Sequence, residues 1–429
     1  GMDVARFGDW ATLAYTNTKV RENYSRRFRI RFPNEELPAA RPLRTTPIYD
    51  RLVAENAVFG EYCSLENPLW FAPKNMAPRE DVTFRRSNAH DHVGAECRAV
   101  RMGVGMTEIA NYGKIEVEGP RAAEFLSYVM ANKLPPVGKL ALTPMLNEQG
   151  KLIGDFTIGR TADDKFLLVC SYAAESHYMR WFERHAPASG VLIRAASMDY
   201  PGLSIAGPKS RALLQAITRE DVSNEKFPFL SFRRMDIGMI PALVGRVTFT
   251  GDLGYEIWVR PEYQRALYDL LLKEGERFGL KQFGMRALLC MRLEKSFGTW
   301  MKEYRPIYGA YEAGLGRFVD LKKNGFIGRE AAAREKESGG KLRLQTFAVD
   351  ALDADAFGDE PIWHDGEVVG WVTSGGYGHS VGQSLALGYI PKELAAAASG
   401  FEVEIIGERR PAKRLDAPIF DPQGLRMRS

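Results

Sequence analysis

Cysteine is scarce in this sequence. Among its 429 residues there are only four, at Cys63, Cys97, Cys170 and Cys290. They lie far apart and form no CxxC pair, so neither a disulfide framework nor a zinc site is expected. This use of cysteine suits a reducing compartment.

Long hydrophobic runs and a dominant charge are also missing. No apolar run approaches the roughly 20 residues that a bilayer-spanning helix needs, and the N-terminus lacks the charged-then-apolar order of a signal peptide. The 58 Lys and Arg residues nearly balance the 54 Asp and Glu residues, which leaves a net charge of +4. We therefore expect a cytoplasmic protein that acts on small molecules, with neither membrane nor nucleic acid as its main partner.

The common catalytic fingerprints are absent as well. The sequence contains no P-loop, no GxSxG elbow and no HExxH. Gly376, Gly378 and Gly382 only loosely resemble a dinucleotide fingerprint, and their spacing is wrong for one. His90 and His92 have no third ligand nearby in the sequence. We expect no NAD, FAD or metal site in this chain.

The length favours two or three compact units, at roughly 100 to 200 residues each. Residues 1–44 are interpreted as an N-terminal arm. An amphipathic helix is expected over residues 8–25, with Trp10 and Val20 on its apolar face, and a half-exposed strand over residues 26–32. A proline-rich connector follows, so the compact part is expected to begin near residue 45.

Two similar segments of the sequence predict an internal duplication of the fold. Residues 117–130 and 205–217 each run from a strand end through Gly-Pro into a helix, with the proline at the first helical position. Two such units indicate paired α+β subdomains with a ligand cleft between them. Chance similarity is the alternative.

The sequence after residue 340 predicts a different kind of unit. Four short strand-like runs, over residues 342–349, 367–373, 384–390 and 402–406, are separated by Gly and Asp turns, which is typical of an antiparallel β domain. Residues 334–340 are charged and glycine-rich, as an exposed hinge would be. The predicted division is a body over residues 45–338 and a β domain over residues 339–429.

Two carboxylates stand out because they interrupt strand-like runs, where acidic residues are disfavoured. Asp155 could steady a positive charge or accept a proton, or it could be an ordinary turn residue. Glu256, beside Tyr255, could accept two parallel hydrogen bonds from a flat heterocycle, or it could lie on the wetter face of a strand. Arg292 belongs to a largely apolar helix and needs a carboxylate partner, from the protein or from a ligand.

Six motifs occur in the order found in the glycine cleavage T-protein (aminomethyltransferase) family, which this sequence resembles over about residues 45–425. They are residues 143–155 (TPMLNEQGKLIGD), 250–257 (TGDLGYEI), 292–295 (RLEK), 311–315 (YEAGL), 326–330 (FIGRE) and 372–375 (VTSG). Residues 32–38 (FPNEELP), 44–47 (RTTP) and 57–61 (AVFGE) resemble more closely the C-terminal, folate-binding half of dimethylglycine and sarcosine dehydrogenases.

The resemblance implies an α+β, three-lobed fold with duplicated subdomains, a C-terminal antiparallel β-barrel and a central tetrahydrofolate site. By motif match, Asp155 is the catalytic carboxylate that orients the folate amine, and Glu256 holds the pterin ring. Arg292 supports that site, and Tyr255, Phe249 and Trp300 complete the predicted cofactor-binding set. Phe249 stands where relatives commonly have Tyr, and the Trp300 segment differs from the T-protein and could shape another donor pocket.

The resemblance also implies a function. The expected activity is transfer of a one-carbon unit from an N-methyl amine, such as a methylated glycine, to tetrahydrofolate, in partnership with a flavin subunit. A direct demethylase that forms methyltetrahydrofolate is one alternative, and a non-catalytic folate-binding protein is another.

Overall fold

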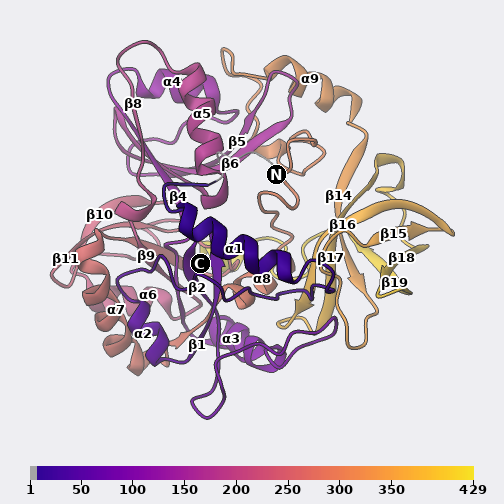
Figure 1. Cartoon of the computed structure of the whole chain (residues 1–429). Coiled ribbons are helices and arrows are strands. Elements are labelled where there is room, and N and C mark those ends of the chain that lie inside the picture. Colours follow the sequence, from indigo (N-terminus) through magenta and orange to yellow (C-terminus); the bar gives the residue numbers. More distant parts are fainter. Residues whose placement is uncertain (1–6) are drawn as a thin grey trace.

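The computed structural model describes residues 7–429, in which two sheets and a closed barrel each form the centre of one lobe (Figure 1). The first six residues of the predicted arm lie outside the described part. The first sheet has the order β5-β6-β7-β4-β8 and is antiparallel throughout. Its elements are β4 (Tyr112–Glu118), α4 (Ala122–Val129), β5 (Leu140–Leu146), β6 (Leu152–Ala162), β7 (Lys165–Ser171), α5 (Glu175–His185) and β8 (Leu192–Ala195).

The second sheet repeats this plan with the order β10-β11-β12-β9-β3-β13. Its elements are β3 (Gly105–Glu108), β9 (Gly202–Ala206), α6 (Ser210–Ile217), β10 (Phe232–Ile237), β11 (Ile240–Gly245), β12 (Gly254–Trp258), α7 (Pro261–Gly275) and β13 (Lys281–Gln282). In both sheets one strand leads into a helix and then pairs with the third strand that follows it. The predicted duplication is confirmed by this shared order.

The strand-to-helix turn of each repeat requires glycine. Gly119 and Gly207 have φ angles of 121° and 123°, which L side chains rarely adopt. A Cβ at Gly207 would also lie 2.3 Å from the carbonyl oxygen of Val100. The helices begin at Ala122 and Ser210, two residues after the prolines, so the expectation that proline occupies the first helical position is wrong.

The two sheets pack on each other through a shared apolar cluster that includes Leu140, Phe232 and Trp258. Gly159 of β6 provides the space, because a Cβ there would lie 2.3 Å from a ring carbon of Phe232. We expect Gly159→Ala to lower the free energy of unfolding by about 1–3 kcal/mol through overpacking. Chemical denaturation measures the loss, and Gly159→Ala combined with Phe232→Leu should recover part of it; no recovery would contradict this packing.

The third lobe is a six-stranded antiparallel barrel in the order β14-β17-β16-β15-β18-β19, closed by pairing of β14 with β19. Its strands are β14 (Leu342–Val349), β15 (Pro361–His364), β16 (Glu367–Gly378), β17 (Gln383–Pro391), β18 (Phe401–Ile405) and β19 (Glu408–Leu415). The sequence predicted four of these. The run predicted as a hinge over residues 334–340 is instead mostly the second half of α9 (Arg329–Ser338), which is capped by Gly339.

The arm carries α1 (Leu13–Ser25), which is shown in indigo in Figure 1. Its Tyr15 hydroxyl and Lys19 amine donate to Glu61 of β1, whereas Leu13, Val20 and Tyr24 are exposed. Residues 26–32 form turns and irregular backbone, so the strand expected there is wrong.

The remaining elements join the arm and the barrel to the second lobe. They are α2 (Tyr49–Ala54), β1 (Ala57–Tyr62), β2 (Leu65–Phe71), α3 (His90–Met102), α8 (Met285–Glu294) and the terminal α10 (Leu425–Arg428). Helices α3 and α8 pack with the β1–β2 hairpin in one apolar cluster. Within residues 7–429 no helix combines the length and the apolar character needed to span a membrane.

Candidate functional site

Asp155 lies in the middle of β6, where it pairs with Pro144 of β5. Burial and the nearby charge of Glu303 raise the pKa of the Asp155 carboxyl to about 7. Burial raises the pKa values of the Tyr178 and Tyr304 hydroxyls, and the charge of Asp155 adds to the rise. Asp155 has no ion-pair partner among the described residues, so its charge is available to a cationic ligand.

Aromatic side chains pack on Gly154 and Phe156, the two neighbours of Asp155 in β6. Trp300 packs edge-on against Tyr178 at 5.6 Å between ring centroids and stacks with His177 at 6.2 Å. The Tyr178 hydroxyl is buried and finds no hydrogen-bond partner in the part of the chain that the structure describes. An unsatisfied buried hydroxyl is costly, so this one calls for a polar partner.

Arg292 of α8 has a protein partner. Its Nη1 atom donates to Glu303 Oε2 at 3.2 Å and to the carbonyl oxygen of Phe297 at 2.9 Å. Glu303 also accepts from the Thr299 amide at 2.9 Å and from the Thr373 hydroxyl at 2.7 Å, which ties α8 to the barrel. The sequence left a protein carboxylate and a ligand open, and the structure shows the protein carboxylate. The buried Nε atom of Arg292 has no partner within residues 7–429.

Glu256 lies on β12, between Gly245 of β11 and Ser204 of β9. Burial raises the pKa of the Glu256 carboxyl to about 8, and the Lys114 ammonium opposes this rise. Neither an ion pair nor a hydrogen bond to the Glu256 side chain occurs among the described residues. A buried, unpaired carboxylate has the chemistry needed to accept N–H donors from a ligand.

Tyr255 points away from this group. Neighbouring residues of a strand face opposite sides, and Tyr255 stacks on Phe227 in the core of the second lobe, with ring centroids 6.0 Å apart. Phe249 stacks on Phe297 at 5.9 Å, next to the carbonyl that Arg292 binds. The structure therefore groups Phe249 with Arg292, and Trp300 with Tyr178, but leaves Tyr255 on the far side of β12.

Lys114 and Asp155 lie on the same face of the first sheet. Lys114 of β4 pairs with Val169 of β7, and Val169 pairs with Thr157, two residues from Asp155 on β6. Cys170 lies on the opposite face, in the apolar core of the first lobe. The amine of Lys114 donates to the carbonyl oxygens of Ile109 and Ala110, in the turn that connects β3 of the second lobe to β4 of the first.

Sequence reasoning missed Lys114, Glu303 and Tyr178. Lys114 alternates with Tyr112 and Glu116 along β4, a pattern that is also typical of a solvent-facing side of a strand. Glu303 lies in an irregular segment whose partners come from α8 and the barrel. No local pattern identifies a residue whose importance comes from partners so distant in the chain.

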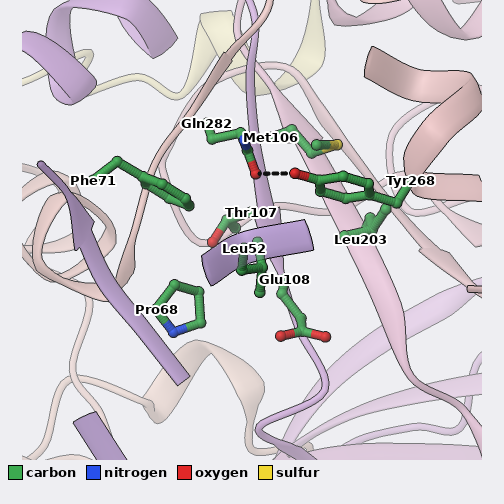
Figure 2. A pocket seen from close by; sticks show the side chains of 9 residues that line it. All are labelled: Leu52, Pro68, Phe71, Met106, Thr107, Glu108, Leu203, Tyr268 and Gln282. Atoms are coloured by element: carbon green, nitrogen blue, oxygen red, sulfur yellow. Dashed lines mark hydrogen bonds between the residues drawn. The ribbon is translucent and has the colours of Figure 1, made fainter. Parts of the chain in front are cut away.

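A separate cleft in the second lobe contains none of the predicted site residues. Figure 2 shows its lining, which includes Glu108, Thr107 and a hydrogen bond from the Tyr268 hydroxyl to Gln282 Oε1 at 3.0 Å. Its interior is too narrow to admit a water molecule. This cleft is a packing defect beside β3 rather than a substrate site.

Comparison with family models matches most of the chain. Residues 48–323 match the GCVT N-terminal domain, and residues 343–421 match the glycine cleavage T-protein C-terminal barrel domain. Residues 1–46 match the FAD dependent oxidoreductase central domain.

Individual relatives agree with these matches. Human mitochondrial dimethylglycine dehydrogenase is 35% identical over 97% of this chain and 49% of its own length. The mouse mitochondrial pyruvate dehydrogenase phosphatase regulatory subunit is 28% identical over 97% of this chain and 51% of its own length. The chain thus spans about half the length of these two relatives. The crystal structure of aminomethyltransferase T from Bartonella henselae superimposes with a TM-score of 0.77 over 89% of this chain and 99% of that protein, at 22% identity, which confirms the three-lobed α+β fold.

Proposed function

Because this chain belongs to the glycine cleavage T-protein family, we propose that it transfers a one-carbon unit from an N-methyl amine, such as a methylated glycine, to tetrahydrofolate. The family carries out folate-dependent one-carbon transfer. The observation that carries the proposal is Asp155, a half-buried carboxylate in the middle of a strand with no cation to pair with in the described chain.

The residues present fit tetrahydrofolate. Its pterin ring offers an N–H group and an amino group side by side, and the unpaired Glu256 carboxylate can accept both. The free Nε atom of Arg292 and the free hydroxyl of Tyr178 are further donors that a polar ligand would satisfy. When bound, tetrahydrofolate supplies the nucleophilic amine that takes up the one-carbon unit.

The residues of the chain then promote the transfer mainly by electrostatic stabilisation. Asp155 in its ionised form lowers the energy of a cationic iminium donor. Because its pKa lies near 7, the same carboxylate can also accept the proton that the attacking amine loses. Trp300 and Tyr178 pack on each other next to β6, and their rings would limit the access of water to the reactive carbon.

A flavoprotein partner completes the proposal, since oxidation of an N-methyl amine to an iminium removes two electrons. Two observations support it: the arm matches an FAD dependent oxidoreductase domain, and a relative at 35% identity is a dehydrogenase of about twice this length. The exposed Leu13, Val20 and Tyr24 of α1 offer an apolar surface to such a partner.

The test is to supply tetrahydrofolate to the chain with a methylated glycine and a flavin dehydrogenase that oxidises it. We expect methylenetetrahydrofolate to form faster than in the same mixture without the chain, where released formaldehyde reacts unaided. Equal rates with and without the chain would overturn the proposed transfer. Methyltetrahydrofolate as the product of the chain alone would instead show a direct demethylase.

A non-catalytic folate-binding protein is the second candidate. It is favoured by one observation, the regulatory subunit that shares 28% identity over 97% of this chain. Binding of tetrahydrofolate without any acceleration of transfer would support this candidate over the first.

Glu256→Gln should weaken tetrahydrofolate binding by about ten- to one hundredfold, because glutamine offers one neutral acceptor in place of a charged pair. Calorimetric titration under anaerobic conditions measures this loss. Glu262→Gln, at an exposed position in the first turn of α7, is the matched control and should bind as the unmodified chain does. If both variants bind equally well, the pterin is held elsewhere.

A further inference from the structure

The segment that follows the barrel returns to the second lobe. Residues 416–429, which we call the tail, leave the last barrel strand, β19, and end with the short helix α10. Figure 1 marks the C-terminus near α8, in the middle of the molecule. The main-chain oxygen of Ser429 accepts from Arg211 and Arg246 of the second lobe. The tail therefore bridges the barrel and the second lobe.

The first half of the tail binds the C-terminal end of α8. The Phe420 amide donates to the carbonyl oxygen of Glu294 at 3.1 Å, and the Arg101 guanidinium lies 3.7 Å from the centroid of the Phe420 ring. The amine of Lys295, the C-cap residue of α8, donates to the carbonyl oxygen of Asp421 at 2.5 Å. The tail therefore holds the end of the helix by main-chain and side-chain contacts together.

The second half of the tail reaches the second lobe through Arg426. The Asp421 carboxylate accepts from the backbone amides of Leu425 at 2.9 Å and Arg426 at 3.2 Å, which fixes the start of α10. Arg426 Nε then donates to Asp252 Oδ1 at 2.5 Å, and its Nη2 donates to the carbonyl oxygen of Arg101 at 2.6 Å. Arg426 thus joins the tail to α3 and to the turn before β12.

Asp252 is the residue of that turn that the tail holds. Its side chain is 1% exposed, and its two oxygens are divided between two cations, Arg426 at Oδ1 and Arg101 at Oδ2. Within residues 7–429 no other group donates to Oδ1. A buried carboxylate oxygen that loses its donor carries a desolvation cost, so the turn has to rearrange when Arg426 is lost.

The turn over residues 248–252 and helix α8 carry residues of the proposed tetrahydrofolate site. Phe249 lies within the turn, Glu256 follows on β12, and Arg292 belongs to α8. The turn also packs directly on α8, because a Cβ at Gly251 would lie 2.3 Å from the side chain of Lys295. The tail therefore contacts both of the elements that present these residues.

We propose that the tail is a strap that couples the barrel to the tetrahydrofolate site, with Arg426 as its positioning residue. This inference rests on the proposed function, because it assigns a role to contacts around the same site. With the tail bound, Arg426 and Arg101 together hold Asp252, and the turn presents Phe249 and Glu256 in one arrangement. With the tail released, the turn has to be ordered when the ligand binds, and the cost of that ordering lowers the affinity.

The first test is anaerobic calorimetric titration of Arg426→Met with tetrahydrofolate. We expect binding about tenfold weaker than that of the unmodified chain, because Asp252 loses the donor to its Oδ1 atom. Arg426→Lys keeps a cation at this position and should recover most of the affinity. Arg428→Met is the matched control, since Arg428 is exposed on the same helix and donates to the carbonyl oxygen of Gln423 within the tail. Unchanged affinity in Arg426→Met, or an equal loss in Arg428→Met, would overturn the proposal.

The second test uses the unmodified chain and a readout that a merely structural tail would not change. If release of the tail weakens tetrahydrofolate binding, linkage requires bound tetrahydrofolate to oppose that release by the same factor. Trypsin cleaves after Arg426 from the released tail, so saturating tetrahydrofolate should slow this cleavage about tenfold. Cleavage after Arg27, which is exposed in the arm, is the internal reference and should keep its rate. Equal cleavage after Arg426 with and without tetrahydrofolate would overturn the inference.

The outcomes separate the strap from the proposed function. Chemical denaturation checks that Arg426→Met is folded, and it should lose less stability than Arg101→Met, because Asp252 keeps its ion pair with Arg101. If Arg426→Met does not fold, the trypsin measurement on the unmodified chain decides. A chain that binds tetrahydrofolate without protection of its tail would overturn the inference and leave the proposed function intact. Failure of the unmodified chain to bind tetrahydrofolate would instead overturn the proposed function.

Discussion

Asp155→Asn should slow one-carbon transfer by about 10²- to 10³-fold and leave the affinity for tetrahydrofolate within about threefold. The amide keeps the size and shape of the carboxylate but removes the charge that stabilises a cationic donor. The nearby Glu303 is bound to Arg292, so it does not replace that charge. Single-turnover measurement of methylenetetrahydrofolate formation, read beside a calorimetric titration, separates the two effects.

The pH dependence gives this prediction a second readout. The pKa of Asp155 is raised to about 7, so the ionised form gains population as the pH rises through 7. Transfer by the unmodified chain should therefore rise over that range, and Asp155→Asn should have lost this rise. Asp163→Asn, on an exposed turn, is the control and should keep both rate and profile. An Asp155→Asn variant with an unchanged rate would remove Asp155 from the mechanism.

The duplicated units and the two carboxylates could be predicted because each is marked by residues close together in the sequence. Glycines that must adopt a positive φ are visible in the sequence, as at Gly119 and Gly207. Asp155 and Glu256 were visible because each interrupts a strand-like run. The same local reasoning grouped Tyr255 with Glu256, although strand alternation places their side chains on opposite faces.

Features that depend on distant partners could not be predicted. Lys114 is buried because the second lobe packs against β4. Glu303 binds Arg292, Thr299 and Thr373 because α8 and the barrel meet around it. Strand β19 was missed because it is rich in Arg and Lys and has few apolar residues, and pairing with β14 and β18 supplies the order that its sequence does not indicate.

Arg101→Met should be the most destabilising of the substitutions considered for this chain, by about 3–5 kcal/mol. Arg101 of α3 donates to Asp252 at 2.5 Å and to Glu294 at 2.6 Å, and both carboxylates are almost fully buried. It also binds the carbonyl oxygen of Thr250 at 2.7 Å. Methionine fills the volume but leaves Glu294 without its cation and Asp252 with only its second ion pair, to Arg426.

The position of this network gives the loss a functional consequence. Thr250 and Asp252 form the turn that leads directly into β12, the strand that carries Glu256, so loosening the turn should also weaken tetrahydrofolate binding. Chemical denaturation measures the stability, and Arg85→Met is the control, because Arg85 and Asp353 form an exposed pair worth less than about 1 kcal/mol. Equal stability losses in the two variants would mean that burial does not set the strength of the Arg101 network. The turn before Glu256 would then be held in place by other contacts.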